Sequence, residues 1–146
     1  MKTLAPIIVS ACLLGIRSRY DGTHALSPKA LRALKGRCVI PVCPEQLGGL
    51  PTPRPKASIQ GTGGSDVLNG RAIVSDENGA DVTGYFIKGA TEVLRIAALT
   101  CAQEALLKEK SPSCGVSFIR RGRRTVKGRG VCAALLEKNG IRIKGM

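Results

Sequence analysis

Two short apolar segments constrain the fold of this chain more than any other feature. The first runs from Pro6 to Ala11 and the second from Cys38 to Val42, and neither alternates between apolar and polar residues. Strands that are exposed on one face alternate, whereas strands covered on both faces form continuous apolar runs. Both segments therefore predict buried strands of a parallel sheet.

Helical patterns separate these segments from later ones. A helix is predicted over 27–36, where Ser-Pro gives a typical start and glycine the end, and a longer one is predicted to begin near Asp81. Further elements are expected as a helix over 131–138, strands over 71–75, 105–108 and 116–119, an edge strand over 141–143, and loops over 44–55 and 61–70. Strands that alternate with helices predict an α/β fold with a mainly parallel sheet flanked by helices, in a Rossmann-like three-layer arrangement. With 146 residues, the chain has the size of a single domain spanning 1–146.

The charge of the chain favours an anionic partner. Lys and Arg number 23 against 10 Asp and Glu, a net charge of +13, and six of the basic residues lie within 120–129 without any acid. Nucleic acid, including tRNA bound through residues 120–129, is therefore a candidate partner. A basic, solvated surface without a polyanion partner explains the same count.

The N-terminal region bears on the compartment. An apolar stretch followed by Cys12 resembles a lipoprotein signal, but Pro6 interrupts it and the chain stays apolar after the cysteine. No segment is long enough to span a membrane. We therefore expect a cytoplasmic protein with reduced thiols and no membrane partner.

Three cysteines occupy equivalent positions. Cys12, Cys43 and Cys114 each lie where an apolar run gives way to a turn, and the carboxyl ends of parallel strands are where such folds bind ligands. Structural zinc usually has four ligands from C-x-x-C pairs, and this chain has no such pair. Three thiolates without a fourth suit a cubane iron–sulfur cluster with one iron left open, and Glu45 is then a candidate proton-transfer group. Three unrelated cysteines at strand ends are the alternative.

Four segments of the chain resemble the thiouracil desulfurase family: SACLLG at 10–15, RYDG at 19–22, VCPEQLGGLPTPR at 42–54 and KEKSPSCG at 108–115. The resemblance implies a [4Fe-4S] cluster held by Cys12, Cys43 and Cys114, whose open iron binds the sulfur of 4-thiouracil or a related thiolated pyrimidine. Water would then replace the sulfur without net redox change. Many family members carry a second cysteine where this chain has Ser18, so either that position is not a ligand or the ligand was lost here.

The same resemblance implies roles for individual side chains. Glu45 would activate the water or transfer protons, and Ser111 would bind the substrate or assist the proton transfer, with Ser113 as its neighbouring alternative. The residues expected to contact the substrate in the pocket are Tyr20, Asp21 and Arg54.

Several alternatives remain open at this point. The substrate is a small thiolated base or nucleoside, or else thiouridine within tRNA. A nucleic-acid-binding protein with a structural metal is a second class, and an iron–sulfur electron carrier, which needs four ligands and no Glu45, is a third. His24, the single histidine, is either a general acid or a surface residue of its loop.

Overall fold

The structure, a computed structural model, describes residues 4–146 and is built around a parallel sheet. The strands of this sheet follow the order β2-β1-β5-β8: Val39–Val42, Ile7–Ser10, Glu104–Leu107 and Arg142–Gly145. β1 pairs in parallel with a strand on each side, so that Ser10 lies opposite Val42 and Val9 lies opposite Leu106. The carboxyl ends of β2, β1 and β5 therefore meet at one edge of the sheet. The buried strand β1 and the edge strand β8 are confirmed. The second predicted buried strand, β2, lies instead at the opposite edge of the sheet, where Pro41 is exposed and only Val42 is buried.

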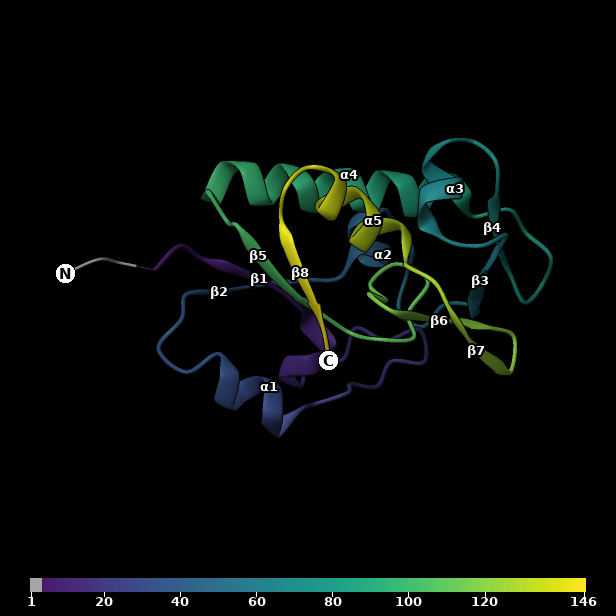
Figure 1. Cartoon of the computed structure of the whole chain (residues 1–146). Coiled ribbons are helices and arrows are strands. Elements are labelled where there is room, and N and C mark those ends of the chain that lie inside the picture. Colours follow the sequence, from purple (N-terminus) through teal and green to yellow (C-terminus); the bar gives the residue numbers. More distant parts are fainter. Residues whose placement is uncertain (1–3) are drawn as a thin grey trace.

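Helices cover both faces of the sheet (Figure 1). On one face lie α4 (Thr83–Thr100) and α5 (Val131–Lys138), and on the other lies α1 (Pro28–Ala33). The predicted α/β class with a helix-flanked parallel sheet is thus confirmed. None of the helices within residues 4–146 is both long and apolar enough to cross a membrane.

The side chains of β1 explain its apolar run. Ile8 is buried in the larger core with Phe86 of α4, whereas Ile7 and Val9 belong to the smaller core beneath α1. Since successive side chains of a strand point to opposite faces, a strand covered by helices on both sides has no polar face to alternate with.

Several shorter elements surround the sheet, and some differ from the prediction. The predicted loop 44–55 contains the short helix α2 (Pro44–Leu47), because Pro44 occupies its first turn after Cys43 at the N-cap. The predicted loop 61–70 contains α3 (Gly64–Leu68), at whose start Thr62 hydrogen-bonds Asp66. The remaining elements are the 3-10 turn η1 (Ala11–Leu14), the antiparallel pair β3 (Ala57–Gln60) and β4 (Ile73–Asp76), and the hairpin β6 (Phe118–Arg121) and β7 (Arg124–Lys127). β3 and β7 were not predicted.

The strand expected over 116–119 begins two residues later, at Phe118. The carboxylate of Glu109 accepts the backbone N–H groups of Val116 at 2.7 Å and of Ser117 at 3.0 Å. These two donors are therefore withdrawn from strand pairing. The basic segment 120–129 forms most of the β6–β7 hairpin that follows.

Two glycines bring α2 directly against the backbone of α4. A Cβ added at Gly89 would overlap the backbone of Pro44, and one added at Gly48 would overlap the backbone of Tyr85. The close approach is possible only because neither residue has a side chain. It fixes the position of α2, which carries Glu45.

Candidate active site at the carboxyl ends of the strands

A cavity of about 140 Å³ opens where β1, β2 and β5 end. Its lining includes all three cysteines that the sequence placed at strand ends, Cys12, Cys43 and Cys114, together with Glu45. The other polar lining residues discussed below are Ser10, Ser18, Arg19, Tyr20, Arg54, Lys56, Lys108, Lys110, Ser111, Ser113 and Arg120. The parallel sheet thus brings together groups that are up to about a hundred residues apart in the sequence.

Each of the three cysteines is held by a different local structure. Cys12 lies in η1, which begins directly after β1, and its carbonyl accepts the N–H of Ala25 at 2.9 Å. Cys43 is the N-cap residue of α2. Cys114 lies in the loop after β5, where its own N–H donates to Ser111 Oγ at 3.0 Å. All three thiols are free of disulfides.

The loop that carries Cys114 is tied to the first turn of α5. The N–H groups of Cys132 and Ala133 donate to the carbonyl of Ser113, at 2.9 and 3.1 Å, and that of Val131 donates to Pro112 at 2.9 Å. The first N–H groups of a helix have no partner within the helix, so the loop carbonyls satisfy them. The contact therefore fixes the Cys114 loop and the start of α5 relative to each other.

Burial controls the protonation of the three thiols. It raises the pKa of Cys114 to about 12, although hydroxyl groups of Ser10 and Ser113 oppose the shift. Burial also raises the pKa of Cys12, where the ammonium of Lys108 opposes it, and the pKa of Cys43, where the backbone N–H of Gln46 opposes it. Charge on one thiol raises the pKa of another, which places the three within electrostatic reach. Without a bound cation, the site therefore favours neutral thiols.

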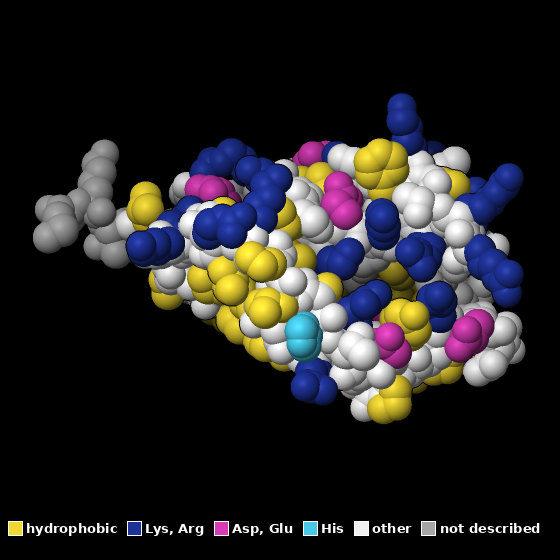
Figure 2. Space-filling view, turned by 90° about the horizontal axis from the view of Figure 1, so that it is seen from below, with side chains coloured by type: hydrophobic (Ala, Val, Ile, Leu, Met, Phe, Trp, Pro, Cys, Tyr) yellow, Lys and Arg dark blue, Asp and Glu magenta, His cyan; other side chains and the backbone are white. Residues whose placement is uncertain are grey.

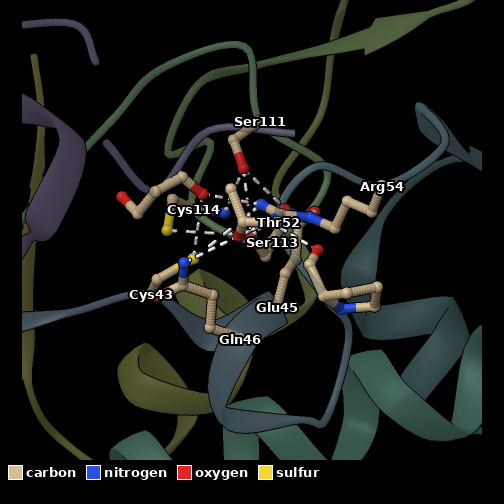
Figure 3. A network of polar contacts seen from close by, with 10 residues as sticks. Cys43, Glu45, Gln46, Thr52, Arg54, Ser111, Ser113 and Cys114 are labelled. Atoms are coloured by element: carbon tan, nitrogen blue, oxygen red, sulfur yellow. Dashed lines mark hydrogen bonds and ion pairs between the residues drawn. The ribbon is translucent and has the colours of Figure 1, made fainter. Parts of the chain in front are cut away.

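A network of short hydrogen bonds surrounds Glu45 (Figure 3). Arg54 Nε donates to Glu45 Oε1 at 2.9 Å, and Ser113 Oγ donates to Glu45 Oε2 at 2.9 Å. The side chains of Arg54 and Glu45 are only 3% and 13% exposed, so water screens this ion pair little. Both carboxylate oxygens of Glu45 are thus held in fixed directions.

Ser111 extends the network on the side of Cys114. Its Oγ lies 3.0 Å from Ser113 Oγ and accepts the N–H groups of Ser113 and Cys114, at 3.2 and 3.0 Å. A chain of hydroxyl groups therefore leads from Ser111 through Ser113 to the carboxylate of Glu45. Ser113 also approaches Cys114, its Oγ lying 3.8 Å from Cys114 Sγ.

Tyr20 lines the cavity, and two cations lie close to its ring. The side-chain nitrogen of Lys56 lies 5.3 Å from the centre of its ring, and the guanidinium of Arg19 lies 5.8 Å from it. These distances are within the range of cation–π attraction. The backbone carbonyl of Tyr20 accepts the N–H of Arg54 at 2.8 Å, which ties its loop to the Glu45 network.

Two residues considered in the sequence lie outside the cavity lining. Asp21 is exposed, and its carboxylate accepts the N–H and the hydroxyl of Thr23, at 3.1 and 2.5 Å. The hydrogen bond from the Thr23 hydroxyl is the main reason why the pKa of Asp21 is lowered. His24 is exposed, and its Nδ1 accepts the N–H of Leu26 at 3.1 Å. The structure therefore brings together every other candidate side chain but not these two.

The cavity is surrounded by positive charge. Besides the paired Arg54, its lining includes five cations: Arg19, Lys56, Lys108, Lys110 and Arg120. Within the described part of the chain, none of these five forms an ion pair, and Lys108 is half-buried, which lowers its pKa. Figure 2 shows Lys and Arg side chains gathered around a hollow on one face of the molecule.

The other three cysteines do not line the cavity. Cys132 is fully buried in the larger core, and Cys38 and Cys101 are exposed. Across residues 4–146, no three His, Cys, Asp or Glu side chains converge closely enough to hold a single metal ion.

Sequence reasoning gave no role in the cavity to Ser10, Lys108 or Ser18, all of which line it. Ser10 is buried, and its Oγ accepts the N–H of Lys108 at 2.9 Å. Lys108 directly follows β5, as Cys43 directly follows β2, and this placement was available as a signal. Ser18 is buried, and its carbonyl oxygen lies 3.6 Å from the Cys43 sulfur. This is a backbone contact, which no sequence pattern predicts.

Comparison with known proteins identifies the family of the chain. The chain is 44% identical over 140 residues to "Uncharacterized protein YbbK" of Bacillus subtilis (strain 168), covering 94% of this chain and 93% of that protein. A solved structure named [4Fe-4S]-dependent thiouracil desulfidase TudS is 42% identical, with a TM-score of 0.83 over 97% of this chain and 91% of that one. Residues 7–145 match the family described as 2-thiouracil desulfurase. The chain therefore belongs to the 2-thiouracil desulfurase family.

Proposed function

We propose that this protein removes the sulfur of a thiolated pyrimidine by hydrolysis. The carbon–sulfur double bond of the thiocarbonyl is replaced by a carbon–oxygen double bond, and water supplies the oxygen while sulfide leaves with the two protons. No electron is gained or lost. The observation that carries the proposal is the convergence of three free thiols and an oriented carboxylate, Glu45, on one cavity.

The donor set of the cavity suits an iron–sulfur cluster. Cys12, Cys43 and Cys114 approach it from three loops, and the described lining includes neither a fourth cysteine nor a histidine. All three thiols line the same cavity, as ligands to different irons of one cluster have to do. When bound through these three residues, a [4Fe-4S] cluster with one iron free of protein ligands supplies a Lewis acid that suits a soft sulfur atom. The TudS structure, named as [4Fe-4S]-dependent, supports the same assignment.

The protein side chains handle the water and its protons. Glu45 is the group that accepts a proton from the attacking water, since Arg54 and Ser113 hold its two oxygens in place. The hydroxyl groups of Ser113 and Ser111, 3.0 Å apart, offer a path for that proton toward the substrate or the departing sulfide. Tyr20 supplies an aromatic surface for the pyrimidine ring, and its flanking cations hold this surface at the cavity.

The positive lining favours a substrate that carries a phosphate. Five unpaired cations around a cavity attract an anion, whereas a neutral base has no charge with which they could pair. A thiouridine nucleotide therefore fits the charges better than the free base. Thiouridine within tRNA is the second candidate, supported by the same cations, although of the basic segment 120–129 only Arg120 and Gly122 reach the lining.

Anaerobic reconstitution with iron and sulfide tests the proposal. The reconstituted protein is expected to contain about four irons per chain and to release sulfide from 4-thiouracil, 4-thiouridine or 4-thiouridine monophosphate, with loss of the thiocarbonyl absorbance. Glu45→Gln should keep the cluster absorbance and lose turnover. Glu77→Gln, on an exposed glutamate outside the cavity, is the matched control and should keep both.

Two results would contradict the proposal. A colourless protein that retains only zinc would indicate a structural metal, and full activity of Glu45→Gln would remove the carboxylate from the mechanism. The choice among substrates is measured separately, by comparing kcat/KM for base, nucleoside and nucleotide. Binding of bulk tRNA that weakens steeply with salt would favour the RNA substrate.

A further inference from the structure

Arg54 uses every hydrogen-bond donor that its side chain possesses. A guanidinium has five N–H donors in a planar fork. Nε donates to Glu45, Nη1 to the carbonyl of Pro51 and the hydroxyl of Thr52, and Nη2 to the carbonyl of Ser18 and the sulfur of Cys43. No donor remains for a substrate. The expected role of Arg54 in substrate contact therefore has no free group to perform it.

Two of the five acceptors belong to the proposed chemistry. Arg54 Nε lies 2.9 Å from Glu45 Oε1, and Nη2 lies 3.8 Å from Cys43 Sγ (Figure 3). The side chain is 3% exposed, so its charge acts through protein and not through water. Since a guanidinium does not deprotonate in proteins, a permanent positive charge stands between the carboxylate and the sulfur.

We propose that Arg54 is a positioning residue that links the cluster ligand Cys43 electrostatically to the proton-transfer group Glu45. This inference rests on the function proposed above, because it takes Cys43 as a ligand. The guanidinium balances the negative charge of Glu45 and part of the negative charge of a Cys43 thiolate. It also fixes the two side chains relative to each other, through one rigid group that the loop 51–54 and the carbonyl of Ser18 hold in place.

The pairing of charges predicts opposite effects on the reduction potential of the cluster. A nearby positive charge stabilises the added electron, so its removal lowers the potential, whereas removal of a nearby negative charge raises it. In the reconstituted protein, Arg54→Met is therefore expected to shift the midpoint potential downward and Glu45→Gln to shift it upward. The double variant should return close to the wild-type value. An EPR-monitored redox titration measures all four potentials.

Two further variants separate charge from shape. Arg54→Lys keeps the charge but loses the fork, so its potential should stay near that of the wild type while kcat falls more than KM changes, because Glu45 is no longer oriented. Arg142→Met is the matched control. Arg142 also pairs with a glutamate, Glu104 at 3.0 Å, but at the amino ends of the strands, opposite the cavity, and its removal should leave the potential unchanged.

The midpoint potentials of these variants test the inference. It would be overturned if Arg54→Met and Glu45→Gln shifted the potential in the same direction or left it unchanged, since a purely structural role predicts no cancellation of the two shifts in the double variant. If Arg54→Met does not fold, judged by the unfolding transition of the apo-protein, Arg54→Gln replaces it, and a lowered potential supports the link while an unchanged one refutes it.

Failure of the proposed function has a different signature. A wild-type protein that assembles a cluster but releases no sulfide from any thiolated pyrimidine refutes the function, and the potentials still decide the role of Arg54. A wild-type protein that takes up no cluster refutes both.

Discussion

The contact between α2 and α4 makes a sharp test of how the site is positioned. In the variant Gly89→Ala, the added Cβ would lie 2.7 Å from the carbonyl carbon of Pro44 and 3.2 Å from the nitrogen of Gly48. Normal contacts are about 3.5 Å or longer. The carbonyl oxygen of Pro44 would be closer still. All these atoms belong to the backbone, so no side-chain rotation relieves the overlap, and α2 has to move by at least about 1 Å. Glu45 moves with it, because it lies in the first turn of α2.

The expected loss of stability is small and the expected loss of activity is large. Overpacking costs about 1–3 kcal/mol of unfolding free energy, and replacing a helical glycine by alanine returns about 0.5–1 kcal/mol. The net destabilisation is therefore at most about 2.5 kcal/mol. A displacement of about 1 Å at a catalytic group lowers the rate roughly 100-fold. Gly89→Ala should thus fold and lose most of its turnover.

Urea unfolding of the apo-protein and sulfide release by the reconstituted enzyme measure the two effects. Gly84→Ala, on the same helix, is the matched control, because its added Cβ meets no atom within 4 Å. It should be at least as stable as the wild type, by up to about 1 kcal/mol, and fully active. Equal stability and activity of the two variants would refute the idea that this backbone contact positions Glu45.

Three further predictions concern the loop of Cys114 and the cysteines outside the site. The stability that the apo-protein gains from keeping Cys114 protonated is complete below the ordinary thiol pKa of 9.0. It is lost as the pH rises toward the folded pKa of about 12, at about 1.4 kcal/mol per pH unit. Urea midpoints should therefore fall between about pH 8 and 10, and Cys114→Ala should flatten this pH dependence; an equal slope in the variant would contradict the assignment. Ser111→Ala leaves the N–H groups of Ser113 and Cys114 without their acceptor, and the unfolding free energy should drop by about 1–3 kcal/mol; an unchanged urea midpoint would mean that other acceptors replace the hydroxyl. Cys101→Ser alters an exposed residue at the end of α4, and iron content and sulfide release should both stay at the wild-type level; loss of either would implicate a fourth thiol.

The sequence predicted the part of the fold that hydrophobic burial controls. The run that became β1 lacks alternation because helices cover both faces of the strand, and that property is visible in the residues themselves. The run that became β2 has the same pattern, but the strand lies at the edge of the sheet and is only partly buried. The convergence of Cys12, Cys43 and Cys114 on one cavity followed from the same argument, since neighbouring parallel strands end at one edge.

The remaining features depend on contacts that no local pattern encodes. α2 and α3 form in segments rich in glycine and proline, because backbone packing against α4 and α5 stabilises turns whose composition favours loops. The segment that leads into β6 is held by Glu109, whose carboxylate accepts the N–H groups of Val116, Ser117 and Phe118. The position of Arg54 was expected at the pocket, but its commitment to five protein acceptors is a tertiary property.

The link between the Cys114 loop and the first turn of α5 has a consequence for the biosynthesis of the protein. During translation, Cys12 and Cys43 emerge early, whereas Cys114 emerges late, and its loop is fixed only when the N–H groups of Val131 to Ala133 are available as donors. The site therefore does not exist on the nascent chain while the first two-thirds of the protein are being made. Under the proposed function, all three cluster ligands are therefore in place only after α5 has docked, and until then the early cysteines are thiols without their partners.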